Sequence, residues 1–303
     1  MITELGNLIA AEWLKLRRRP MAWILLATFL GLLLFYLATW AMVVALHEGT
    51  LSGGTTRIML LSEPQIDELK RQLSFPGIFG AVLGQVNSTG GICAIILAAG
   101  FVGSEYGWGT FRLLLTRAPH RGFYLVAKLL TLLLGLLGAI LVALLLGSLI
   151  AMVCQASLGL SSTLHFRALL LLPLGVARSL LVILPYVMLT ITSSIFGRSV
   201  LAGVGGGLMF LALDMSAGSI NTLAGVDPLV QMLVNLLLQP NINTLIVMNS
   251  QLFGLDQSLL VGGLDLSHLP SPLHATLVIL VYSGGFFWTA YRLLLRRDVA
   301  GAL

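Results

Sequence analysis

The chain has 303 residues, of which 57% are hydrophobic and only 10% are charged. An ordinary soluble domain is roughly 25% charged, so this composition excludes a protein built mainly of water-exposed domains. The net charge of +5 comes from basic residues beside apolar segments, which is typical of membrane topology signals rather than of nucleic-acid binding. Cys93 and Cys154 form no disulfide or metal-binding pattern. The composition therefore predicts an all-α integral membrane protein.

Residues 1–21 are predicted to form an amphipathic segment at the membrane surface. Apolar side chains recur at helical spacing from Leu8 to Leu16, and a basic run follows them. Such a segment can lie in the interface, with its tryptophan and arginines among the lipid headgroups. The interfacial residues would be Trp13, Lys15, Arg17, Arg18 and Arg19. The alternative is that the basic run signals topology and has no other role.

Six apolar runs are long enough to cross a bilayer, which requires about 20 residues of helix. The first run is too long for the core of a cleavable signal peptide. The fifth run is the weakest because glycines interrupt it, although glycines also let helices pack closely within lipid. The predicted spans are residues 22–46, 77–102, 123–153, 176–196, 200–220 and 273–295.

The 17 lysines and arginines predict that both termini are cytoplasmic. In that orientation twelve of them lie on the cytoplasmic side, four lie outside and Arg178 lies within a span. The positive-inside rule selects this arrangement, and cytoplasmic termini require an even number of spans. We therefore predict a single multi-pass domain, residues 1–303, in the cell membrane (the inner or plasma membrane).

Two long outer loops are predicted, at residues 47–76 and 221–272. In the first loop, Ser62 is expected to cap a short helix that has a proline in its first turn. In the second loop, the apolar stretch 229–238, closed by Pro240, is too short to span. An interfacial or re-entrant helix is expected there.

Charged residues within the spans are few, which argues against a proton-coupled or ion-coupled carrier. Arg178 and Asp214 lie toward the outer ends of the fourth and fifth predicted spans, at similar depth. We expect them to form an intramembrane ion pair, because each charge would offset the cost of burying the other. A structural clamp is favoured over a role in transport.

The sequence contains no recognisable catalytic, cofactor-binding or metal-binding pattern. It has no phosphate-binding loop of the form G-x-x-x-x-G-K-[S/T], no H-E-x-x-H and no G-x-S-x-G. The five histidines are scattered over loops and span ends. We therefore expect no enzyme activity, cofactor or metal on this chain.

Residues 103–122, between the second and third predicted spans, form the most informative loop. It contains one acid, three arginines and a patch of leucines, and Pro119 prevents one helix from running through it. A short helix under the membrane could show its arginines to the cytoplasm and its leucines to a partner protein or the bilayer. An amphipathic loop that contacts only lipid is the alternative.

The order of residues in this loop is distinctive. It runs Glu105-Tyr106-x-x-Gly109-Thr110-x-Arg112, then Leu114-Leu115-Thr116-Arg117, Arg121 and Lys128. This order resembles the permease subunits of ABC-2-type ABC transporters. Weaker features extend the resemblance over nearly the whole chain: Glu12-Trp13-x-Lys15 before a basic run, six spans, a large loop before the last span, and Arg296-Arg297-Asp298.

The resemblance implies an ATP-driven exporter in which two permease copies, as a homodimer, bind two copies of a separate ABC ATPase that holds ATP and Mg. The segment that contacts the ATPase would include Glu105, Tyr106, Gly109, Thr110, Arg112, Arg117 and Arg121. Residues 8–19 would be the surface helix in contact with membrane lipid. No nucleic acid is expected as a partner. The cavity between apolar helices is expected to be apolar, which favours a hydrophobic or amphipathic cargo. The first outer loop is longer than the short hairpin of many such permeases.

Two other classes of protein stay open. The chain could be a membrane scaffold or assembly factor that transports nothing. A membrane-embedded enzyme is less favoured, because histidines and carboxylates do not cluster in the sequence. A neighbouring gene for an ATPase would favour the permease over both.

Overall fold

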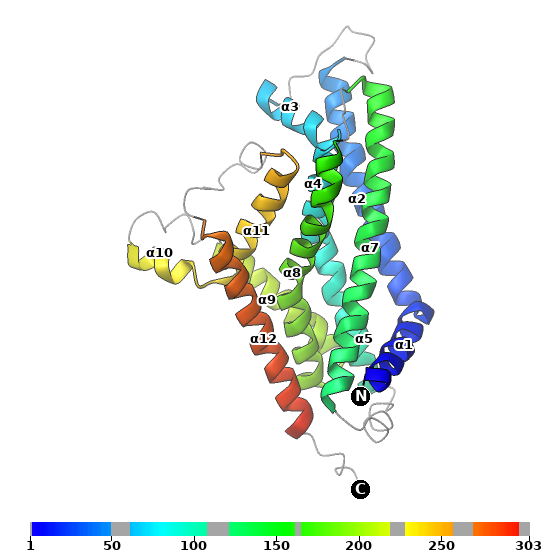
Figure 1. Ribbon diagram of the computed structural model, residues 1–303, viewed down its shortest axis with the longest axis vertical. Helices are drawn as coiled ribbons and strands as arrows, with labels where there is room; N and C mark the ends of the chain where they lie inside the picture. The colour runs from blue at the N-terminus through cyan, green and yellow to red at the C-terminus, as the bar shows by residue number, and fades with distance from the viewer. Residues whose placement is uncertain are drawn as a thin grey trace.

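The computed structural model is α-helical, with no strand among the residues that it describes, which are 2–49, 61–107, 121–160, 165–218, 228–256 and 269–296. The helices form an elongated bundle (Figure 1). The helices are α1 (Ile2–Arg18), α2 (Pro20–His47), α3 (Glu63–Gln72), α4 (Gly77–Gln85), the π-helix η1 (Val86–Gly90), α5 (Gly91–Gly107), α7 (Arg121–Leu158), α8 (Phe166–Gly197), α9 (Val200–Gly218), α10 (Pro228–Val234), α11 (Leu238–Leu252) and α12 (Pro272–Arg296).

Among the described residues, five helical segments are long and apolar enough to cross a membrane. They are Pro20–His47, Gly77–Tyr106, Gly122–Leu158, Phe166–Gly197 and Pro272–Arg296. A helix rises 1.5 Å per residue, so even 25 residues extend roughly 37 Å, which exceeds the hydrocarbon core of about 30 Å. The prediction of an all-α, multi-pass membrane protein is confirmed.

The remaining predicted span, residues 200–220, corresponds to α9, whose apolar part is shorter than the other five segments. α9 follows α8 after a tight turn in which Arg198 adopts a left-handed conformation with φ of 52°. It packs along α8 and α5. The count of six spans therefore stays a prediction.

Glycines allow α5, α8 and α9 to approach closely. A Cβ atom on Gly103 of α5 would lie 2.6 Å from the Cα atom of Val200, and a Cβ atom on Gly203 of α9 would lie 2.0 Å from the Ser194 hydroxyl. Close helix approach through small residues is the usual way in which helices associate within lipid. The glycine-rich run 203–207 is thus a packing surface of α9 rather than a break in it.

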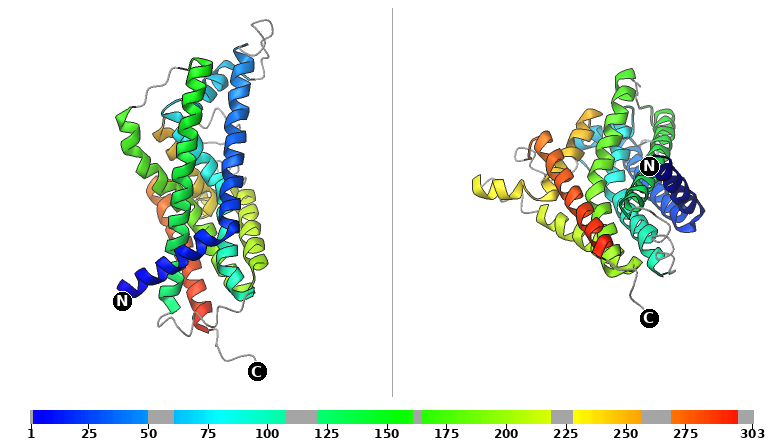
Figure 2. Two further views of the ribbon diagram at one scale, coloured as in Figure 1. Left: turned by 90° about the vertical axis from the view of Figure 1, so that its right-hand side faces the viewer. Right: turned by 60° about the horizontal axis from the view of Figure 1, so that its bottom comes forward.

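α1 is a helix of its own and crosses the end of the bundle instead of continuing α2 (Figure 2). Arg19 has extended backbone angles between the two helices, and Pro20 occupies the first position of α2, where its missing N–H costs no helical hydrogen bond. We call this end, where the last residues of α12 also lie, the α1 pole, and the opposite end the α3 pole (Figure 1).

The helices of the two predicted outer loops lie at and below the α3 pole. The backbone N–H of Ser62 donates to the Gln65 side chain (3.1 Å), so α3 begins after Ser62, as expected. In the second loop the prediction was wrong in one respect, because Pro240 lies in the first turn of α11 and does not close a helix. α11 packs against α4, α8, α9 and α12. It is therefore part of the bundle and not a purely interfacial segment.

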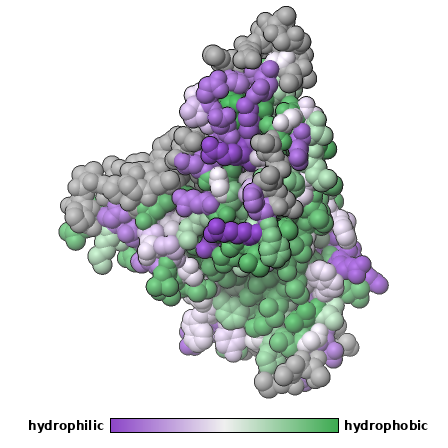
Figure 3. All heavy atoms as spheres, turned by 45° about the horizontal axis from the view of Figure 1, so that its top comes forward, coloured by the Kyte–Doolittle hydropathy of each residue, from purple (hydrophilic) through white to green (hydrophobic). Residues whose placement is uncertain are grey.

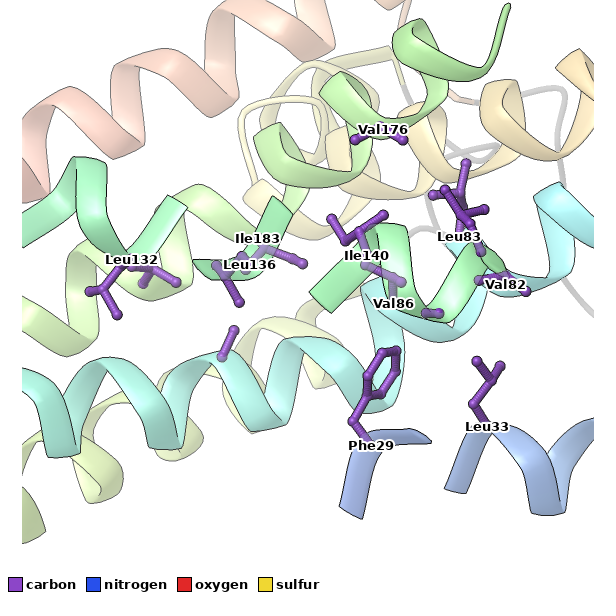
Figure 4. Close-up of a cluster of buried hydrophobic side chains, with 14 of the residues drawn as sticks. Phe29, Leu33, Val82, Leu83, Val86, Leu132, Leu136, Ile140, Val176 and Ile183 are labelled. Carbon is purple, nitrogen blue, oxygen red and sulfur yellow. The ribbon is translucent and has the colours of Figure 1, made fainter. Parts of the chain in front are cut away.

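The main hydrophobic core lies where α2, α4, η1, α7 and α8 meet. Figure 4 shows Phe29, Val86, Leu136, Ile140 and Ile183 pointing toward one another from these helices. The outer surface is also largely apolar, but hydrophilic residues gather around the α3 pole (Figure 3). An apolar exterior beside an apolar core is what a bilayer-embedded bundle requires.

Candidate functional site

Five polar residues from three helices meet inside the α1 pole. We call this group the charge cluster, and it consists of Glu12, Lys15, Glu105, Tyr124 and Lys128. Glu12 and Leu16 lie one turn apart on the buried face of α1, whereas Trp13 and Arg17 face outward. Tyr124 and Lys128 likewise lie one turn apart on α7.

Lys128 lies at the centre of the charge cluster and has no exposed surface. Its Nζ atom is 3.0 Å from Oε2 of Glu12, 2.9 Å from Oε1 of Glu105 and 3.2 Å from the Phe101 carbonyl oxygen. The same ammonium group lies 4.1 Å from the centre of the Phe101 ring, within cation–π range. One lysine on α7 therefore joins α1 to α5.

Lys15 and Tyr124 complete the charge cluster. The Lys15 ammonium forms a salt bridge with Glu12 and another, of 3.3 Å, with Glu105. The Tyr124 hydroxyl donates to the second carboxylate oxygen of Glu105. Two carboxylates thus face two ammonium groups, so the formal charges cancel, as buried ions require.

The pKa of Glu12 follows from its neighbours in the charge cluster. Burial raises this pKa, but Lys128 and Lys15 oppose burial and hold it below the ordinary value of 4.5. Glu12 is therefore ionised at neutral pH. A neutral carboxylic acid would leave the buried ammonium group of Lys128 poorly compensated.

Arg19 attaches the junction of α1 and α2 to the end of α5. Its guanidinium donates to the Gly100 carbonyl oxygen and to the Ser104 hydroxyl, each at 2.9 Å. It also lies 5.4 Å from the centre of the Phe101 ring. Because Lys128 approaches Phe101 as well, the last two turns of α5 are held from both the α1–α2 junction and α7.

The described structure brings together some of the predicted site residues. Glu105 is buried in the charge cluster, and Tyr106 follows it on α5. Arg121 begins α7, although its side chain lies outside the described part. Gly109, Thr110, Arg112 and Arg117 lie outside the described residues.

The predicted interfacial residues divide into two groups. Lys15 and Arg19 point into the protein and bind Glu105 and α5, so their role is not limited to the membrane surface. Trp13, Arg17 and Arg18 are exposed, as expected for an interfacial helix.

The predicted ion pair between Arg178 and Asp214 was wrong. The Asp214 carboxylate accepts hydrogen bonds from the Tyr186 hydroxyl (2.6 Å) and the Gln239 backbone N–H (3.1 Å). In the described part of the chain Arg178 makes no salt bridge with it, and Arg178 remains half-buried on α8. Asp214 lies level with Tyr186, and Arg178 precedes Tyr186 by eight residues on α8, about 12 Å along the helix, so the two side chains do not share the predicted depth.

A polar cleft of about 610 Å³ opens between α2, α3, η1, α8 and α11. Its apolar lining includes Ile92, Val182 and Ile242. Its polar lining consists of amides and hydroxyls without a formal charge, and includes Tyr36, Gln72, Gln85, Asn87, Ser88, Thr89, Tyr186, Gln239 and Asn243.

Asn87 is the unusual residue of the polar cleft. It lies in η1, and π-helical segments occur frequently at functional sites. Its amide nitrogen and oxygen are both buried and have no hydrogen-bond partner among the described residues. An unsatisfied buried amide lowers the stability of the protein by roughly 1–3 kcal/mol. A bound molecule that forms hydrogen bonds with Asn87 would recover this free energy.

The sequence indicated Glu105 and Lys15 as site residues, but not that they meet Glu12, Tyr124 and Lys128. Lys128 lies within the third predicted span and belongs to the motif that follows Glu105, and Glu12 belongs only to the N-terminal Glu12-Trp13-x-Lys15 pattern. A lysine within an otherwise apolar helix was the available signal, because such a residue needs an acidic partner. Asn87 gave no comparable signal.

Comparison with models of known protein families, with curated proteins and with solved structures found no match. The class of protein therefore rests on the fold: this chain is an all-α, multi-pass membrane protein with a buried charge cluster near one pole of its bundle.

Proposed function

We propose that this chain is the permease subunit of an ATP-driven exporter of the ABC-2 type, energised by a separate ATPase. It would cross the cell membrane six times, with the α1 pole in the cytoplasm, where most of its lysines and arginines would then lie. A second copy would complete the translocation path. The hydrolysis of ATP would take place on the partner, which accounts for the missing phosphate-binding motif.

The observation that carries this proposal is that residues on both sides of segment 108–120 in the sequence meet in the charge cluster. Glu105 precedes this loop on α5, and Tyr124 and Lys128 follow it on α7. A force applied to the loop would therefore reach both flanking helices, and through Glu12 it would reach α1. Such a connection is what an ATPase needs in order to move a helical bundle.

We expect the full-length chain to copurify from its native membrane with an ABC ATPase. Reversing two loop charges, with Arg112→Glu and Arg117→Glu together, should reduce the amount of bound ATPase at least tenfold. The matched control is Arg167→Glu, because Arg167 is exposed in the first turn of α8 and lines a cavity with Arg71 and Ser74, away from the α1 pole. Quantitative pull-down measures the ratio of the two subunits.

The result also separates the alternatives. If no ATPase copurifies, the permease proposal is wrong. If the double reversal retains as much ATPase as the control does, the ATPase does not bind at the loop 108–120. A scaffold or assembly factor would bring other membrane proteins with it in place of an ATPase.

The polar cleft supports an amphipathic cargo. The uncharged amides and hydroxyls of its lining would bind hydrogen-bonding groups, and the apolar side chains between them would bind hydrocarbon. Because the polar lining carries no formal charge, it suits polar groups that are not strongly ionic. We therefore narrow the expected cargo to molecules with both apolar surface and neutral hydrogen-bonding groups.

The free amide of Asn87 can be tested without knowing the cargo. Asn87→Leu should raise the stability of the purified protein by about 1–3 kcal/mol, because it removes an unsatisfied buried group of similar size. Gln155→Leu, at an exposed position of α7, should leave stability nearly unchanged. Thermal unfolding in detergent measures both. A marked loss of stability in Asn87→Leu would show that this amide has a structural partner and is not kept for cargo.

A further inference from the structure

An apolar groove lies beside α1, separate from the charge cluster and from the polar cleft. It has a volume of about 290 Å³ and is bounded by α1, α2, α5 and α7. Its floor includes Phe29, Leu136 and Ile140, whose side chains are drawn in Figure 4. We call it the α1–α7 groove. An α-helix with side chains is about 10–12 Å wide, so a groove of this size suits a hydrocarbon chain better than a helix.

Small residues on α7 keep the α1–α7 groove open. A Cβ atom on Gly138 would have no heavy atom within 4 Å, so the space in front of this glycine is empty. A Cβ atom on Gly135 would lie 2.9 Å from a methyl group of Leu16, which marks where α1 closes over the groove. The sequence of α7 thus leaves a channel between two helices that otherwise pack together.

The mouth of the α1–α7 groove carries positive charge and indole rings. Arg17 lines it, together with Trp13 and Trp23, and the Trp23 indole N–H donates to the Arg17 carbonyl oxygen (2.8 Å). The side chains of Arg17 and Arg18 are exposed and form no salt bridge with any residue that the structure describes. Their neighbours Lys15 and Arg19, by contrast, bind groups inside the protein.

We propose that the α1–α7 groove binds one anionic phospholipid, with an acyl chain in the groove and its phosphate at Arg17. Charge complementarity selects an anionic headgroup, because no carboxylate among the described residues pairs with Arg17 or Arg18. Tryptophans at the mouth match the headgroup level of a bilayer, where indole rings are enriched. A free phosphate would leave the apolar groove empty. The proposal does not depend on the permease function.

The test compares lipid binding by the full-length, delipidated protein in detergent. Native mass spectrometry counts bound dioleoyl phosphatidylglycerol and dioleoyl phosphatidylcholine during titration. We expect the first bound phosphatidylglycerol to be tighter than phosphatidylcholine. Arg17→Ala should weaken phosphatidylglycerol about fivefold, because a basic residue at a membrane surface contributes about a factor of that size. Arg17→Lys should restore most of the affinity, and Arg167→Ala should have no effect.

Gly138→Leu fills the groove and tests the place of the acyl chain. It should abolish the tight phosphatidylglycerol site, whereas Gly31→Leu should not, because a Cβ atom at Gly31 also has empty space around it but lies away from the groove. Thermal unfolding checks that each variant is folded. If Gly138→Leu fails to fold, Gly138→Val replaces it.

Four results would overturn the proposal. The first three are equal binding of the two lipids, wild-type binding by Arg17→Ala, and equal losses in Gly138→Leu and Gly31→Leu. Each would mean that the bound lipid belongs to the general bilayer shell of the protein. Glycerol phosphate carries the headgroup phosphate but no acyl chain. If it displaces bound phosphatidylglycerol, which is the fourth result, the lipid is held by its headgroup alone and no acyl chain lies in the groove. None of these outcomes would affect the copurification test of the permease.

Discussion

Replacing Lys128 by methionine is expected to lower the free energy of unfolding by about 3–5 kcal/mol, the usual cost of removing one partner from a buried ion pair. The substitution keeps much of the apolar stem but removes the ammonium group that lies 3.0 Å from Glu12 and 2.9 Å from Glu105. Glu12 and Glu105 would then be paired only with Lys15, which is partly exposed. Thermal unfolding of the purified chain in detergent measures the change.

Two further variants make the Lys128 experiment specific. Lys70→Met removes a lysine that is paired with Glu48 near the surface, where a salt bridge contributes about 0–1 kcal/mol. The double variant Lys128→Met with Glu12→Gln should recover part of the loss, because it removes one carboxylate together with the ammonium group. Equal stability of Lys128→Met and Lys70→Met would contradict the charge cluster as described.

A second large loss of stability is expected for Gly103→Val. A Cβ atom at this position would lie 2.6 Å from both the N and the Cα atoms of Val200. These are backbone atoms at the start of α9, so no side chain can move aside to make room. Overpacking of this kind typically costs about 1–3 kcal/mol and occasionally more.

Gly91→Val is the matched control for Gly103→Val. It lies on the same helix, α5, and a Cβ atom there would meet nothing within 4 Å. Both variants change helix propensity in the same way, so the difference between their unfolding temperatures reports the contact with α9. If the two variants unfold at the same temperature, α9 does not pack against α5 in the way that the structure has it.

The main helices could be predicted from the sequence because long apolar runs have few alternatives to membrane helices. The predicted boundaries were poorest where polar residues lie inside a helix. α8 begins at Phe166, well before the predicted start at residue 176, and continues through Pro173. α5 continues through Glu105 because the Glu105 carboxylate binds Lys128 inside the protein and does not need water.

The interior of the site was less predictable because it depends on contacts between distant segments. Glu12 and Lys128 are 116 residues apart, and hydropathy says nothing about which helices become neighbours. Asp214 and Arg178 illustrate the same limit, because the sequence did not show that α9 brings Asp214 level with Tyr186, about two turns along α8 from Arg178. The π-helix that carries Asn87 has no pattern that distinguishes it from the surrounding α-helix.

The measurement that tests the proposed function most directly is ATP hydrolysis by the copurified complex in lipid vesicles. Glu105→Gln should keep the ATPase bound but change its turnover by roughly tenfold or more, because the loop would lose its charged connection to Lys128. Turnover at the wild-type rate in that variant, with the ATPase still bound, would contradict coupling through the charge cluster.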